Sequence, residues 1–260
     1  MATSSVFIFE LKNIKNLEKE IFDSLNKIKI NFQKSLPWEG FTIDNTTNKI
    51  KYEKDDFGAY RFMFAVEEEK EFISLNGKKY KKRQNFFIPV WVDSSSRLML
   101  IFTSDSGLAH RIIKNIIGIR GNNLSFNQLK LEVNFLKWLE ELKDYDGGIL
   151  KEIHGIRATN LSEIDGVADA LSLTTNSKLN RCQIYTPIIG KGNRVYLKGL
   201  FKIGEFEVNA TFYTAGKITI SKKKAKRMTL DEAKHASKDI YFELKRLNKK
   251  WKEQVNPKST

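Results

Sequence analysis

The sequence has little cysteine and little proline. Cys182 is the single cysteine, and there are 4 prolines in 260 residues. One cysteine excludes an intrachain disulfide and a cysteine-based zinc cluster, which suits a reducing compartment. With so few prolines and no low-complexity stretch, the sequence indicates no long linker. We therefore expect a folded chain that is held together without covalent cross-links.

Long apolar runs are also missing. No segment approaches the roughly 20 continuous apolar residues that a membrane-spanning helix needs. Residues 1–11 lack both the basic start and the long apolar run of a secretory signal peptide. We expect a soluble protein that does not bind membranes and is located in the cytoplasm.

The apolar content is nevertheless high enough for a core. Hydrophobic residues make up 41% of the chain and aromatic residues 12%, with 18 phenylalanines, which excludes wholesale disorder. The length fits one large domain or two domains of ordinary size.

The first part of the chain begins with a helical pattern, changes to strand patterns and returns to a helix. Apolar residues recur at helical spacing over 13–29, and residues 105–117 form a second helix that Ser104 or Asp105 can cap. Between the helices, β-branched and aromatic residues predict strands. These strands are residues 41–44, 48–52, 60–66, 86–92 and 98–102.

The second part repeats this order. Residues 125–142 predict a long helix that is apolar on two faces, and we expect it to join the two halves as a buried spine. A short helix over 162–172 follows, and a long helix over 229–254 ends the chain. The strands expected between them are residues 182–186, 194–203, 206–213 and 217–220.

This pattern predicts an α+β fold made of two similar halves of antiparallel sheet covered by helices. The expected domains are residues 1–121 and 122–260. An internal duplication would produce the repeated order of elements. Two unrelated α+β halves would look the same, because the residues themselves do not repeat.

The net charge is +14, which favours polyanionic partners. Residues 121–216 carry 11 Lys/Arg and 11 Asp/Glu, whereas residues 217–260 carry 14 against 5. A lysine-rich composition that reflects an AT-rich genome would also raise the charge, but it would spread it evenly. The clustering therefore favours a basic patch.

Two basic runs each place five cations in six residues. The natural counter-charges of such density are phosphates, and Tyr80 within the first run could stack on a base or a ribose. Alternatives are a solvated hairpin tip, a solvated loop, or a nuclear localisation signal in a eukaryotic protein. The residues are Lys78, Lys79, Tyr80, Lys81, Lys82 and Arg83 in the first run, and Lys222, Lys223, Lys224, Lys226 and Arg227 in the second.

The last helix adds a cationic band and an apolar seam. We expect the seam to pack on the protein's own sheet, although it could instead pair with a partner helix or a second copy. The band would then face outward, either to hold phosphates or to keep the protein soluble. The seam is Leu230, Ala233, Ser237, Ile240, Leu244, Leu247 and Trp251, and the band is Lys234, Lys238, Lys245, Lys249 and Lys252.

Catalytic signals are weak. A carboxylate at Asp55 or Asp56 followed by Glu68 and Lys70 loosely resembles a metal-dependent nuclease, but Glu-x-Lys recurs elsewhere in the chain by chance. His110, His154 and His235 have no metal-ligand spacing. We therefore expect no metal site, no cofactor and no catalytic residue.

The function predicted from the sequence is non-catalytic, sequence-tolerant binding of DNA or RNA along a basic surface. The alternative is a protein–protein interaction subunit of a larger mobile-element or defence complex. A metal-dependent nuclease is the third hypothesis.

Overall fold

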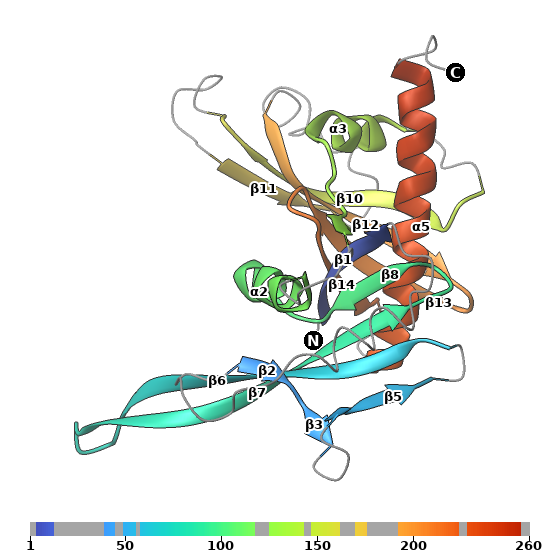
Figure 1. Cartoon of the computed structure of the whole chain (residues 1–260). Helices are drawn as coiled ribbons and strands as arrows, with labels where there is room; N and C mark the ends of the chain where they lie inside the picture. The colour runs from blue at the N-terminus through green and yellow to red at the C-terminus, as the bar shows by residue number, and fades with distance from the viewer. Residues whose placement is uncertain are drawn as a thin grey trace. The chain divides into compact units, whose positions relative to one another are not determined.

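A computed structural model describes residues 4–12, 39–44, 49–55, 58–117, 125–142, 147–161, 170–175, 192–223 and 228–255. The chain divides into two compact units. Unit 2 comprises Phe7–Gln128, and unit 1 comprises Met1–Val6 with Leu129–Thr260. The α+β prediction is confirmed, and antiparallel sheet predominates over the three helices of the described residues (Figure 1).

The sheet of unit 2 has the order β1-β8-β7-β6-β2, with β5 also paired to β6 and β9 to β1. A separate pair is formed by β3 and β4. The strands are β1 (Ser4–Lys12), β2 (Glu39–Phe41), β3 (Ile43–Asp44), β4 (Lys49–Ile50), β5 (Tyr52–Lys54), β6 (Tyr60–Ile73), β7 (Lys79–Asp93), β8 (Leu98–Ile101) and β9 (Ser125–Gln128).

The core of unit 2 lies between this sheet and helix α2 (Ser106–Ile117). Alternate residues of β6, including Phe62 and Phe64, are buried together with Ile112 of α2. The backbone N–H of Leu108 donates to Oδ1 of Asp105 at 3.1 Å, so Asp105 caps the helix. The strand assignments around β6 to β8 and the helix predicted at 105–117 are confirmed.

The sheet of unit 1 has the order β11-β10-β12-β13-β14. A hairpin joins β12 to β13 at Gly204, whose φ of +55° favours glycine. The elements are α3 (Val133–Glu141), β10 (Leu150–Thr159), β11 (Ala170–Thr174), β12 (Asn193–Ile203), β13 (Phe206–Tyr213), β14 (Lys217–Lys222) and α5 (Leu230–Val255).

Helix α5 packs its apolar seam onto β12 and β14 and against α3. Leu244 is fully buried and Trp251 is 8% exposed, and the Trp251 ring lies 5.8 Å from that of Phe135 on α3. The prediction that the seam packs on the protein's own sheet is therefore confirmed. The alternative, a seam that pairs with a partner helix or a second copy, is wrong because unit 1 itself buries the seam residues from Ala233 to Trp251.

Two predicted helices are wrong in part. Residues 125–128 form β9, in which Phe126 pairs with Leu11 of β1, so the helix predicted over 125–142 shortens to α3. Residues 170–172 belong to β11 rather than to the end of a helix, because they pair with β10. The helix predicted at 13–29, the strand at 182–186 and residues 162–169 lie outside the described residues.

A buried ion pair joins α3 to β12 in unit 1. The Arg194 and Glu140 side chains are 2% and 1% exposed. Arg194 donates from Nη2 to Oε2 of Glu140 at 2.7 Å and from Nη1 to the carbonyl oxygen of Gly192, also at 2.7 Å. These charges are removed from water, so each depends on the other.

We predict that Arg194→Met destabilises the protein by roughly 3–5 kcal/mol, because it leaves the Glu140 carboxylate buried without its partner. The double variant Arg194→Met/Glu140→Leu should recover most of this loss. Urea unfolding measures both changes. Glu253→Ala, which breaks an exposed pair with Lys249, is the control and should cost less than about 1 kcal/mol. A single Arg194 variant as stable as that control would contradict the prediction.

His154 on β10 is a buried base. It is 9% exposed, and its Nδ1 atom has no hydrogen-bond partner in the described part of the chain. Burial, reinforced by the positive charges of Lys198 and Lys223, lowers the pKa of His154 from 6.5 to about 4. The imidazole is therefore neutral in the folded protein near pH 7.

We predict that His154 makes the folded protein less stable in acid. Below its ordinary pKa of 6.5 the unfolded chain binds a proton that the folded chain excludes, so stability falls as the pH drops from 6.5 to about 4. His154→Leu should reduce the slope of stability against pH in this interval. Urea midpoints of both proteins across this range test it, and equal slopes would refute it.

Candidate nucleic-acid interface

Strands β6 and β7 continue together beyond their sheet as a two-stranded ribbon. β2 pairs with β6 as far as Val66, and β8 pairs with β7 only from Val90 onward. Among the described strands, residues 67–73 and 79–85 therefore pair only with one another. We call residues 67–85 the arm, which Figure 1 shows extending past β2.

A tight turn closes the arm. The N–H of Gly77 donates to the carbonyl oxygen of Ser74 at 2.8 Å, and the N–H of Ser74 donates to that of Lys78 at 2.9 Å. Gly77 has a φ of +79°, as expected where such a turn ends in a left-handed residue. The first basic run thus begins at the turn with Lys78 and continues into β7.

One face of the arm neutralises its own charge. Opposed residues of an antiparallel pair share a face, so Glu67, Glu69 and Glu71 lie with the odd-numbered cations of β7. The ion pairs on this neutral face are Lys79–Glu71 at 3.0 Å, Lys81–Glu69 at 2.7 Å and Arg83–Glu69 at 3.9 Å.

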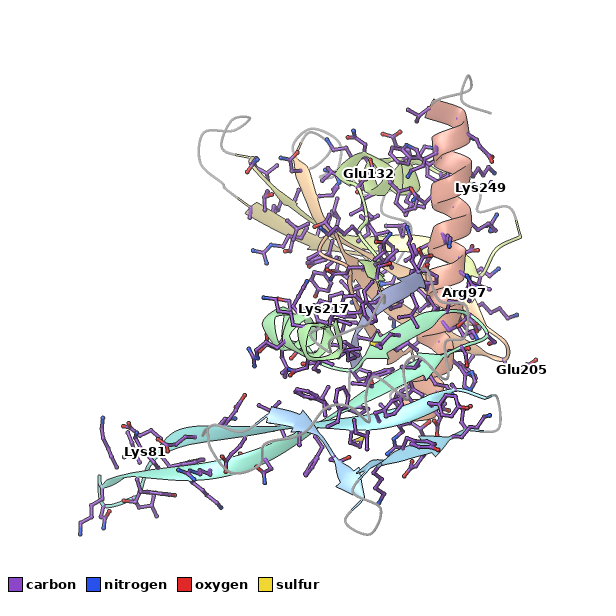
Figure 2. The ribbon with its side chains drawn as sticks, viewed as in Figure 1. Lys81, Arg97, Glu132, Glu205, Lys217 and Lys249 are labelled. Atoms are coloured by element: carbon purple, nitrogen blue, oxygen red, sulfur yellow. The ribbon has the colours of Figure 1, made fainter. Side chains whose placement is uncertain are left out.

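Hydrogen bonding strengthens one of these pairs. The bond from Lys81 lowers the pKa of Glu69, and the same bond raises the pKa of Lys81. Figure 2 labels Lys81 on the arm. Three of the five cations of the first basic run therefore already have carboxylate partners, which their density in the sequence does not reveal.

The opposite face combines aromatic rings with cations, and we call it the aromatic face. Phe72 and Tyr80 oppose each other, with ring centroids 5.6 Å apart and planes 19° from parallel. They are 36% and 50% exposed. Lys70 lies opposite Lys82, 3.6 Å from Glu68 and over the Phe86 ring.

Two cations of the arm have no counter-charge. Within the described residues, neither Lys78 nor Lys82 has a carboxylate within 4.0 Å, and both are exposed. The arm holds six Lys/Arg and four Glu in total. Because the neutral face balances three cations with three carboxylates, the excess charge lies on the aromatic face and the turn.

The tip of the arm is apolar. Ile73 is 69% exposed, and Leu75, in the turn, is fully exposed. Neither residue, nor Phe72, was predicted from the sequence to belong to a functional site. One signal in the sequence could have indicated the exposed apolar tip. Leu75 lies among Ser74, Asn76 and Gly77, which are typical turn formers.

The described part of the second basic run is ion-paired. Lys222 lies 2.6 Å from Glu232, and Lys223 lies 2.8 Å from Glu207. Glu232 also accepts from the N–H of Thr229 at 2.8 Å, and the N–H of Glu232 donates to Thr229 Oγ1. Lys222 therefore supports a capping box at the start of α5, and its bond lowers the pKa of Glu232.

The remaining cations of this run, Lys224, Lys226 and Arg227, lie outside the described residues.

The Lys band of α5 is smaller than predicted. Lys234 is 5% exposed, so the expectation that it faces outward is wrong; the buried stripe of α5 is wide enough to include both Ala233 and Lys234. Lys238 is half-buried, whereas Lys245 and Lys249 are exposed. Figure 2 labels Lys249 on α5, where it lies 3.8 Å from Glu253.

The described carboxylates of the nuclease hypothesis do not come together. Asp55 follows Lys54, which pairs with Tyr60, and its Oδ1 accepts from the N–H of Ala59 at 2.8 Å. Glu68 lies eight residues beyond Tyr60 along β6, about 26 Å at 3.3 Å per residue. Asp55 and Glu68 therefore do not share a metal ion, and Asp56 lies outside the described residues.

Two further observations concern membrane-spanning helices and similarity to known proteins. None of the helices that the structure describes is both long and apolar enough to cross a membrane. No protein-family model matches the chain, and no curated protein matches it significantly.

Proposed function

We propose that the protein binds nucleic acid without catalysis and without strong sequence preference, and that the arm is the main contact. The observation that carries this proposal is the exposed Phe72–Tyr80 pair of the aromatic face, beside which Lys82 on the same face and Lys78 at the turn lack counter-charges. A location in the cytoplasm is part of the proposal.

Phosphate contacts supply the affinity. A lysine that neutralises a phosphate releases condensed counterions, and this release favours binding. Lys78 and Lys82 can make such contacts without giving up an existing ion pair. Lys79 and Lys81 would first have to leave Glu71 and Glu69, so their net contribution is smaller.

The composition of the aromatic face accounts for tolerance of sequence. Reading base edges in a groove relies on bidentate side chains such as Arg, Asn and Gln. Of these types, the even-numbered residues of β6 and β7 in the arm include only Gln84. Charge and ring stacking, which every sequence offers, therefore dominate. Lys224, Lys226, Arg227, Lys245 and Lys249 are candidates for a second contact.

We predict that Lys78→Gln/Lys82→Gln weakens oligonucleotide binding and flattens its salt dependence. Each lost phosphate contact lowers the slope of log affinity against log salt by about 0.7 for a single strand and 0.9 for a duplex. Two contacts should therefore reduce it by about 1.4 or 1.8. Fluorescence anisotropy across a salt series measures both affinity and slope.

Lys79→Gln/Lys81→Gln is the matched control, because it removes the same charge from the same arm on the neutral face. Its slope should stay closer to that of the wild type. Equal slopes for the two double variants would show that only net charge matters and would count against an interface on the aromatic face. Absence of wild-type binding at low salt would overturn the proposed function.

The apolar tip favours a second candidate, a subunit of a larger assembly that docks a protein partner through the arm. Ile73 and Leu75 expose apolar surface that the protein leaves uncovered. This candidate predicts that Ile73→Thr/Leu75→Ser weakens assembly while leaving oligonucleotide affinity unchanged. A protein that fails to bind oligonucleotides at low salt would favour it.

A further inference from the structure

The geometry points to single-stranded nucleic acid as the ligand, with an unpaired base stacking on the ring of Tyr80. This inference rests on the proposed function and specifies the form of nucleic acid and the residue that receives a base. Its starting point is the position of Tyr80 on β7, two residues before Lys82 on the same strand and two residues after Lys78 at the end of the turn. Alternate residues of a strand lie on one face, so Lys82 shares the face of the Tyr80 ring, and Lys78 precedes the ring in the chain.

The ring of Tyr80 has one covered side and one open side. Its stacking with Phe72 across the ladder covers the side that faces β6. No described strand pairs with the other edge of β7 over residues 79–85. The outer side of the ring is therefore available to a second flat group, which agrees with its 50% exposure.

A nucleic-acid base is the flat group that suits these surroundings. Lys82 lies two residues after Tyr80, about 7 Å along the strand, and Lys78 lies two residues before it at the end of the turn. Neither lysine has a carboxylate within 4.0 Å in the described residues. They can hold phosphates on both sides of a stacked base. Base–aromatic stacking tolerates any sequence, because every base has a π-face.

A single strand fits better than a duplex for two reasons. Bases in a duplex are covered by their neighbours in the stack, so only an unpaired base can offer its face to Tyr80. A groove of about 12 Å admits a two-stranded ribbon but encloses both of its faces. Docking of the arm in such a groove would bring Glu67, Glu69 and Glu71 of the neutral face close to the phosphates of a groove wall.

The test compares Tyr80→Ala with Tyr80→Phe, using labelled oligothymidylate, oligouridylate and a DNA duplex of the same length. Wild type should bind the single strands more tightly than the duplex. Tyr80→Ala should weaken single-strand binding roughly 5- to 150-fold, the range that corresponds to about 1–3 kcal/mol per stacked base. Tyr80→Phe keeps the ring and should bind like the wild type. The salt slope of Tyr80→Ala should be unchanged, because no charge is removed.

Tyr80→Ala also removes the contact between Tyr80 and Phe72, so a second measurement uses the wild-type protein. Photo-crosslinking of a 5-iodouracil-substituted single strand to the wild-type protein, followed by peptide mass spectrometry, should place the crosslink at Tyr80. Equal affinity for single strand and duplex, wild-type affinity of Tyr80→Ala, or crosslinks that omit the arm would each overturn the inference. In those cases an altered salt slope of Lys78→Gln/Lys82→Gln would still support the proposed function, whereas no oligonucleotide binding at all would overturn both.

Discussion

The antiparallel register between β6 and β7 is the constraint on which the rest of unit 2 and the arm depend. It runs from Tyr60 opposite Val92 to Ile73 opposite Lys79. Even-numbered residues near its start, such as Phe62, enter the core, and those near its end form the aromatic face. A shift by one residue would move every side chain to the other face, burying charge and exposing the core residues. The buried part of the ladder thus fixes the arrangement of the exposed part.

Ion pairs with carboxylates of neighbouring segments neutralise much of the charge of the two basic runs. The sequence shows two dense cationic runs, but the structure supplies carboxylates from other segments: Glu69 and Glu71 on the arm, and Glu207 and Glu232 beside β14. The charges that stay uncompensated in the arm are few and local. The distinction between a cation that holds the protein together and one available to a ligand is therefore a property of pairing, not of density.

Much of the fold follows from local patterns, and the errors have identifiable physical causes. The ends of α2 and α5 were predicted to within a residue or two, because a capping residue and a regular apolar spacing define them. β1 was not predicted, since its central residues are buried without the alternation of a half-exposed strand. β10 was not predicted, because register shifts against β12 interrupt the alternation of buried and exposed residues along it. β9 is a strand because residues distant in the sequence pair with it. The internal duplication stays a prediction.

The sequence by itself determined the α+β class, the absence of a disulfide within the chain, the buried seam of α5 and the presence of Tyr80 in a cationic stretch, because composition and local periodicity control these properties. Only the tertiary structure decided that Lys79 and Lys81 are neutralised, that Lys234 is buried, that Asp55 and Glu68 are far apart and that Phe72 stacks on Tyr80. Each of these depends on which strand lies beside which and in what register, and residues distant in the sequence set that register through the side chains they bury.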